Sequence, residues 1–218
     1  MFHNTGRDST IFTLDVSNFD TSNVTDMYGM FSGAGYNSTI FTLDVSNFDT
    51  SQVTNMYDMF YNVGYNNTSF TLDVSNFNTS KVTDMCFMFQ GAGYNSKIFT
   101  LDVSGFDTSK VTDMGYMFDR TGYNSTIFEL DTSNFDTSKV TKMEYMFNKT
   151  GYNSTNLVTS ITIRNPNVQS YASMFDGVAT KAGSKITVNY TSETSDLVDQ
   201  MIATKSTNSN VVKGVVVD

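Results

Sequence analysis

Residues 43–56 read Leu43-Asp44-Val45-Ser46-Asn47-Phe48-Asp49-Thr50-Ser51-Gln52-Val53-Thr54-Asn55-Met56, and Met59-Phe60 follow shortly after. The pattern occurs five times, 29 residues apart, with its leading leucine at Leu14, Leu43, Leu72, Leu101 and Leu130. A fixed period of about 20–50 residues is typical of solenoids, in which each repeat forms one coil that contacts only its neighbours. The sequence therefore predicts one elongated array.

Within one repeat, two patterns of apolar residues follow each other. Residues 40–46 alternate in polarity as a half-buried strand does, with Phe41, Leu43 and Val45 turned inward and the residues between them turned outward. A second group spaced at i, i+3, i+6 and i+7 predicts one face of a short helix, and it consists of Val53, Met56, Met59 and Phe60. We therefore expect an α/β solenoid with one strand and one short helix in each 29-residue coil.

The array is expected to cover residues 1–182. Residues 1–13 match the end of a truncated coil, five full coils start from Leu14, and a degenerate coil spans 158–182. Residues 183–218 read as a strand, a helix and a closing strand, and this order predicts a modified last coil that caps the array. Because the chain starts in mid-coil, we expect a longer natural protein with any targeting segment upstream. The uncovered edge near Ile11, Phe12 and Leu14 predicts end-to-end self-association.

Composition argues against several classes of function. The 22 acidic residues outnumber 13 basic ones, for a net charge of −9, which disfavours nucleic acid as a partner. No apolar run approaches the ~20 residues of a membrane helix. The only histidine is His3 and the only cysteine is Cys86, so neither a Ser-His-Asp site nor a zinc site is expected. We expect no enzyme and no cofactor, and we place Cys86 at an outward position.

The outward strand face is the candidate ligand face. Its aspartates form a file at strand spacing, and three interpretations stay open: a merely solvated face whose carboxylates accept bonds from neighbouring hydroxyls, a surface for a cationic partner, or calcium held between adjacent carboxylates. The candidate residues are Thr42, Asp44, Ser46, Thr71, Asp73, Ser75, Thr100, Asp102 and Ser104.

Three further columns recur in register. The methionine and phenylalanine columns that include Met59 and Phe60 are expected to form the core. The asparagine column that includes Asn47 is expected to bond backbone groups at the bend between coils. The tyrosine column that includes Tyr65 predicts either a ladder at the edge of the core or a strip for binding sugars or proteins.

The repeated run Leu-Asp-Val-Ser-Asn-Phe-Asp-Thr-Ser-x-Val-Thr-x-Met-x-x-Met-Phe resembles the short repeats of bacterial surface proteins, and residues 14–31, 43–60, 72–89, 101–118 and 130–147 carry it. These are the BspA-like leucine-rich repeats and the related mycoplasma and listerial lipoprotein repeats. The resemblance implies a leucine-rich-repeat-like fold and display on a bacterial cell surface by a lipid or wall anchor. It also implies, for some members, adhesion to a protein or glycan of a host or another bacterium. The alternative is a passive spacer that presents another domain.

Overall fold

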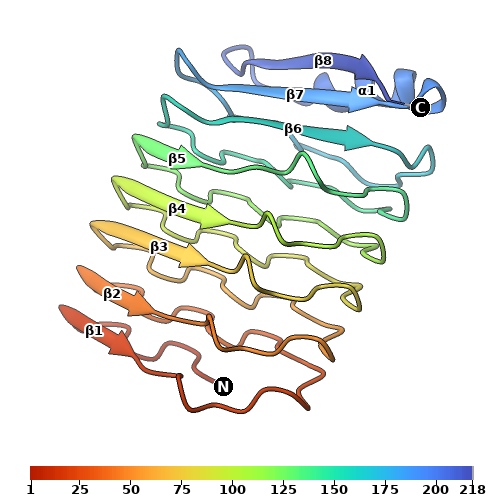
Figure 1. The fold of residues 1–218 in the computed structure, drawn as a ribbon. Helices are drawn as coiled ribbons and strands as arrows, with labels where there is room; N and C mark the ends of the chain where they lie inside the picture. Colours follow the sequence, from red (N-terminus) through yellow and green to blue (C-terminus); the bar gives the residue numbers. More distant parts are fainter. Residues whose placement is uncertain (218) are drawn as a thin grey trace.

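The computed structural model describes residues 1–217 and shows a parallel β-solenoid whose coils stack into a column (Figure 1). Each coil contributes one strand to the same wall, and like residues of successive coils pair in register, as Phe12 does with Phe41 and Phe70 with Phe99. The strands are β1 (Ile11–Leu14), β2 (Ile40–Leu43), β3 (Ser69–Asp73), β4 (Ile98–Asp102), β5 (Ile127–Glu129), β6 (Val158–Ile163), β7 (Lys185–Tyr190) and β8 (Val211–Val216).

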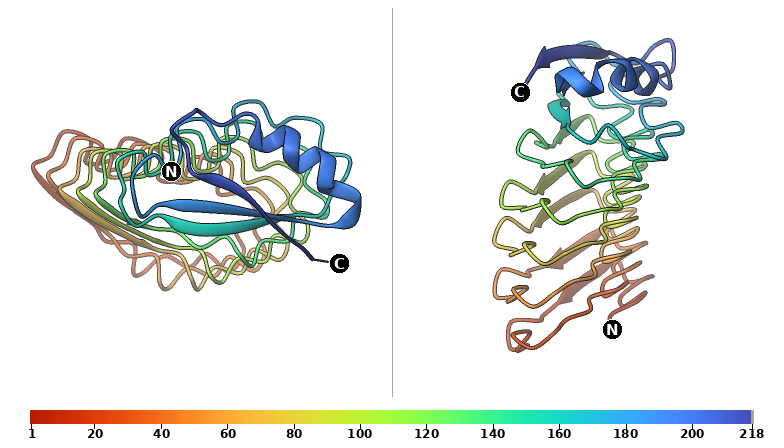
Figure 2. Two further views of the ribbon diagram at one scale, coloured as in Figure 1. Left: turned by 90° about the horizontal axis from the view of Figure 1, so that it is seen from above. Right: turned by 90° about the vertical axis from the view of Figure 1, so that its right-hand side faces the viewer.

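The core consists of rows of identical side chains, as the period predicts. Phe31, Phe60, Phe89 and Phe118 are fully buried, and neighbouring rings of this row stack with centroids 5.5–5.7 Å apart. A second row runs behind the strands, where Phe70 and Phe99 stack at 5.7 Å. Because the rings have nearly the same spacing in both rows, successive coils are about equally far apart on the two sides of the core. Seen from above, successive coils largely superpose as a flattened oval (Figure 2).

The prediction of a short helix in each coil is wrong. Residues 55–64 form a chain of tight turns, and with 26–35, 84–93, 113–122 and 142–151 they make what we call the turn wall. Along this wall, alternate residues donate to the next coil: Asp58 N–H bonds the Cys86 carbonyl at 3.1 Å and Phe60 N–H bonds the Met88 carbonyl at 2.9 Å. The residues between them close turns within the coil, as Tyr61 N–H does with the Asp58 carbonyl at 3.1 Å.

Two physical reasons disfavour the helix. In a helix, each backbone N–H donates to a carbonyl four residues back in the same coil, so it cannot join two coils. A helix is also ~10 Å wide, which is about twice the spacing of stacked strands. The turn wall instead keeps the strand spacing and uses the N–H groups to join coils. It needs residues at positive φ, and Asp58 (φ 62°), Asn62 (φ 53°) and Gly64 (φ 56°) supply them. Gly64 is favoured because a Cβ there would lie 2.9 Å from the Phe70 ring.

A buried threonine column links consecutive coils at the corner after each strand. Thr79 is 1% exposed, its hydroxyl donates to the Asp107 carbonyl at 2.9 Å, and it accepts the Asp107 N–H at 2.8 Å. The hydroxyl thus satisfies both backbone groups of one residue in the next coil, which buried backbone groups require. Thr21, Thr50 and Thr108 donate in the same way.

The strand wall is divided into three sheets, with the orders β1-β2, β3-β4-β5 and β6-β7-β8. At both divisions an asparagine side chain replaces a backbone acceptor. Asn67 Oδ1 accepts the Phe41 N–H at 3.0 Å, and Asn156 Oδ1 accepts the Phe128 N–H at 3.0 Å. The hydrogen-bonded ladder of the strand wall is therefore interrupted at two places, between β2 and β3 and between β5 and β6.

The C-terminal residues have the predicted strand, helix and strand. α1 (Ser195–Ile202), preceded by the 3-10 turn η1 (Ser192–Thr194), lies between β7 and β8 and is the only α-helix in residues 1–217. It buries Val198 and Met201. Past this helix, Thr204 and Ser206 offer their hydroxyls to the N–H groups of Phe175 and Gly177, at 3.2 and 3.1 Å. These hydroxyls replace the carbonyls that a further coil of turn wall would supply.

At the opposite end, β1 pairs only with β2 among the described residues. Ile11 is 67% exposed there, while Phe12 and Leu14 are half-buried against the core.

Candidate functional site

All nine candidate residues lie on the outer surface of the strand wall. Eight are exposed and Ser75 is half-buried, as the strand alternation predicts. The parallel register sets Thr71 beside Thr100 and Asp73 beside Asp102, so the candidate face is a set of straight files across β2, β3 and β4. The structure thus brings these residues together as a repeating surface. Thr42, Asp44 and Ser46 line a shallow hollow of about 220 Å³ with residues of the first coil. The nine candidates as a set do not share one pocket.

Each aspartate of the file is hydrogen-bonded to a serine of its own coil. Asp44 Oδ1 accepts the Ser46 N–H at 2.9 Å, and Asp73 Oδ1 accepts both the N–H and the hydroxyl of Ser75, at 3.0 and 2.7 Å. These bonds, the serine side chain first and its N–H second, lower the pKa values of Asp44 and Asp73, so both are charged at neutral pH. A serine hydroxyl thus bonds Asp73, as the solvated-face interpretation expects, whereas Asp102 accepts the Ser104 N–H, at 2.9 Å. The Oδ2 atoms of Asp44 and Asp73 accept no hydrogen bond within residues 1–217.

An exposed apolar file runs beside the aspartates, and the sequence analysis missed it. Ile40 is 52% exposed, Ile98 47% and Ile127 45%, at the N-terminal ends of their strands, and Ile11 and Val158 are exposed at the starts of β1 and β6. The file is interrupted in β3, where Ser69 holds this position. The signal was present in the sequence, because Ile40 has the same outward parity as Thr42 in the alternating strand. Across the wall the outer surface therefore reads isoleucine, threonine and aspartate.

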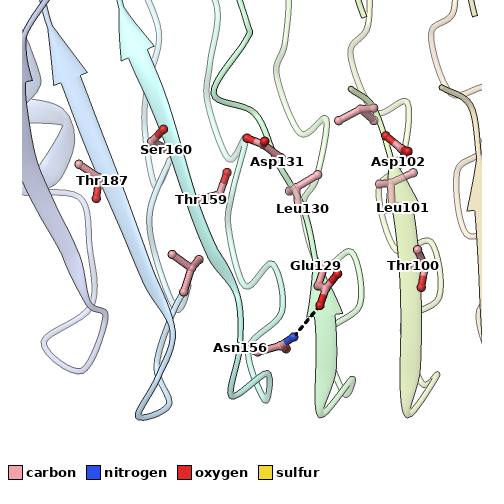
Figure 3. Close-up of a pocket in the computed structure, with 12 residues that line it drawn as sticks. Thr100, Leu101, Asp102, Glu129, Leu130, Asp131, Asn156, Thr159, Ser160 and Thr187 are labelled. Carbon is pink, nitrogen blue, oxygen red and sulfur yellow. Dashed lines mark hydrogen bonds between the residues drawn. The ribbon is translucent and has the colours of Figure 1, made fainter. Parts of the chain in front are cut away.

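A cleft opens in the strand wall where β5 and β6 fail to pair (Figure 3). Its volume is about 660 Å³. Side chains bridge the two coils at either end of it: Asn156 at one end, and at the other Thr132, whose hydroxyl donates to the Ser160 carbonyl at 2.8 Å. Asp102, Glu129 and Asp131 lie on the lining, and none of the lining residues is basic.

The tyrosine column is a closed stack. Tyr36, Tyr65, Tyr94, Tyr123 and Tyr152 lie face to face with centroids 4.5–5.0 Å apart. The guanidinium of Arg7 covers the outer face of the Tyr36 ring at 4.3 Å, and the ammonium of Lys181 lies 5.5 Å from the Tyr152 ring at the other end. Every ring face is thus occupied, which supports the structural ladder and leaves no face for a stacked sugar.

Two further expectations have clear outcomes. The asparagine column bonds the preceding coil as predicted, with Asn76 Nδ2 donating to the Ser46 carbonyl at 2.6 Å. The outward position expected for Cys86 is wrong: its side chain is buried, and burial, followed by the nearby charges of Asp113 and Asp84, raises the pKa of its thiol. The burial is not shared by the whole column, because Tyr28 at the same position of the turn wall is 59% exposed.

No group of three or more His, Cys, Asp and Glu residues within 1–217 has the geometry to hold a metal ion. The calcium interpretation of the aspartate file therefore finds no ligand set in this part of the chain.

Comparison with known families gives one match. A family model described as "Mycoplasma protein of unknown function, DUF285" matches residues 1–98 and 65–190. The chain belongs to this family. The matched ranges contain the whole candidate face and the cleft, and they end at Tyr190, the last residue of β7. The resemblance to mycoplasma repeats is thereby confirmed.

No curated protein and no solved structure matches this chain. Within residues 1–217, the structure contains no helix of the length and hydrophobicity needed to span a bilayer.

Proposed function

We propose that this chain is a non-enzymatic recognition module of a bacterial cell surface, which binds a protein or glycan of a host or another bacterium through its outward strand face. The observation that carries the proposal is the exposed surface in which files of isoleucine, threonine and aspartate lie side by side, with Ser69 and Glu129 as the exceptions in the first two files. Exposed apolar side chains beside ordered charges are the usual composition of a protein-binding surface.

The geometry of the aspartates supports a charged interface. Their serine bonds hold each carboxylate in one orientation, so little side-chain entropy is lost when a cationic group arrives. The negative file would attract such a partner over roughly a Debye length of ~8 Å at physiological salt. The module would then read a repeated pattern of positive groups spaced like its own coils.

Membership in a family described as a mycoplasma family fits a bacterial origin. Kinship with the BspA-like and listerial repeats, the leucine-rich-repeat-like label, the lipid or wall anchor and the extracellular location remain part of this proposal, and they rest on the repeated motif.

A passive spacer is the second candidate, and the same serine bonds favour it. If Asp44 and Asp73 serve only to shape the corner after the strand, the file needs no ligand. A spacer would keep its stability and lose no partner when these carboxylates are neutralised.

The test is capture of extracellular-matrix proteins and a glycan array by the immobilised chain and by Asp44→Asn/Asp73→Asn. Asparagine keeps the Oδ1 acceptor for the serine N–H, so the fold is retained and only charge is lost. Recognition predicts at least one retained partner whose binding weakens in the variant and with added salt. Capture of nothing by either protein supports the spacer, and equal capture by both shows a partner that does not use these carboxylates and contradicts the charged interface.

We also propose end-to-end association at the open edge of β1, where Ile11 is exposed. Light scattering at rising protein concentration should show dimers, and Ile11→Lys should remove them. A monomer at every concentration contradicts the proposal.

A further inference from the structure

The cleft between β5 and β6 is larger than a second hollow in the strand wall, of about 220 Å³, which lies beside β1 and β2. Its volume of about 660 Å³ lies within the range of about 300–1,000 Å³ that is usual for ligand sites. It is closed at both ends by the side-chain bridges from Asn156 and Thr132, which hold the two coils at a fixed separation. The cleft is therefore a fixed opening on the face that the proposed function assigns to recognition.

The cleft also exposes an unpaired strand edge. Alternate residues of a strand turn their N–H and C=O groups to opposite edges. The Ser160 carbonyl bonds Thr132 of the preceding coil, so Ser160 and Val158 both turn their backbone groups towards β5. No backbone hydrogen bond joins β5 to β6 within residues 1–217. An open stretch of strand edge is the feature that an added peptide strand uses.

The charges around this edge have one sign. Glu129 and Asp131 stand on the β5 side of the cleft and Asp102 stands behind them on β4 (Figure 3). Glu129 meets only the amide of Asn156, at 3.4 Å, and Asp131 bonds only the Ser133 N–H, at 2.9 Å. Among residues 1–217 neither carboxylate forms an ion pair, so both charges are available to a cation that enters the cleft.

We propose that this cleft binds an extended peptide segment of a partner protein that carries lysine or arginine side chains. The peptide backbone pairs with the open edge at Val158, and a basic side chain of the peptide lies between Glu129 and Asp131. The backbone bonds supply affinity and the carboxylates select for positive charge, which is the division of roles in strand addition. This inference rests on the proposed function, because it names the partner chemistry for one part of the recognition face.

The test is fluorescence anisotropy of the whole chain with a labelled peptide of sequence Lys-Thr-Lys-Thr-Lys-Thr, and with Glu-Thr-Glu-Thr-Glu-Thr as the charge control. The cleft variant is Glu129→Gln/Asp131→Asn, which keeps the acceptors for Asn156 and Ser133. The matched control is Asp20→Asn/Asp49→Asn, which removes the same charge outside both the cleft and the candidate face and keeps the acceptors for the N–H groups of Ser22 and Ser51. We expect the basic peptide to bind, the acidic peptide not to bind, and the cleft variant to weaken binding by about tenfold or more.

Backbone pairing is tested on the peptide, so that folding of a variant is not at issue. N-methylation of alternate residues removes the N–H groups of one peptide edge, and methylation of the other alternate set removes those of the opposite edge. We expect one set to lose binding and the other to keep it. Equal binding of both methylated peptides overturns the strand-addition geometry.

Other outcomes overturn the assignment to the cleft. One such outcome is that the basic peptide does not bind. Another is that the cleft variant and the control variant lose the same affinity for the basic peptide, because that result means a general attraction to acidic surface. If a surface partner is captured and lost in Asp44→Asn/Asp73→Asn while the peptide never binds, the proposed function stands and this inference fails.

Discussion

Replacing Thr79 with valine tests the joint between coils most sharply. Valine keeps the shape and the β-branch of the side chain, and it removes the hydroxyl that bonds the Asp107 carbonyl at 2.9 Å and the Asp107 N–H at 2.8 Å. Each buried backbone group left without a partner costs about 1–3 kcal/mol. Because two groups lose their partner, we expect Thr79→Val to lower the free energy of unfolding by about 2–6 kcal/mol, or the melting temperature by about 4–24 °C.

The matched control is Thr71→Val in the same coil. Thr71 is exposed on the strand face and its hydroxyl bonds nothing in residues 1–217, so the change should stay within about 0.5 kcal/mol. Urea and thermal unfolding of both variants, followed by circular dichroism, give the comparison. Equal midpoints for the two variants would refute the reasoning, because the buried hydroxyl would then contribute no more than an exposed one.

Three further results are expected. Burial raises the pKa of Asp119 in the folded state, so its negative charge destabilises the fold at pH values above that pKa, and the penalty disappears below the pKa of the unfolded chain. Asp119→Asn should therefore raise the melting temperature by more at pH 7 than at pH 3. An equal gain at both pH values would contradict this. Asn148 occupies the same column and shows that an amide fits there. The buried Cys86 thiol should react with a thiol reagent only after unfolding, even at pH 9, as absorbance would show. Gly93→Ala should lower the unfolding midpoint in urea, because Gly93 has φ 56° and an added Cβ would lie 2.8 Å from the Phe99 ring; an unchanged midpoint would show that the turn can rearrange.

The strand wall and the core could be predicted because both depend only on the period and the alternation. A 29-residue repeat places Phe60 and Phe89 in one row whatever the rest of the coil does, and the alternation decides that Phe41 faces inward and Thr42 outward. These predictions needed no knowledge of how the chain returns on the other side.

The turn wall could not be predicted from apolar spacing alone. Val53, Met56, Met59 and Phe60 are buried in it as they would be on a helix, because successive tight turns also bring every third or fourth residue inward. The distinguishing signal was the glycine that recurs in every full coil at the position of Gly64, where φ is positive. The other two positive-φ columns give no such signal, because they also hold residues such as Tyr116 and Arg120.

The cleft could not be predicted because it depends on how two particular coils meet. Thr132 stands in the column that holds Val45, Val74 and Val103, and its hydroxyl takes over a bond that the ladder would have made. The sequence shows the threonine, but whether β5 and β6 pair depends on the register between two coils of different length. A single polar replacement in an apolar column is the signal to look for in related repeats.

The most direct test of the account is the hydrogen-bond partner of the Phe60 amide. A deuterated, isotope-labelled sample allows measurement of the scalar coupling between the Phe60 amide nitrogen and the carbonyl carbon that accepts its bond. The turn wall predicts a coupling to the Met88 carbonyl, in the next coil, at a nitrogen–oxygen distance of 2.9 Å. A coupling to the Met56 carbonyl, four residues back in the same coil, would show a helix and contradict the account.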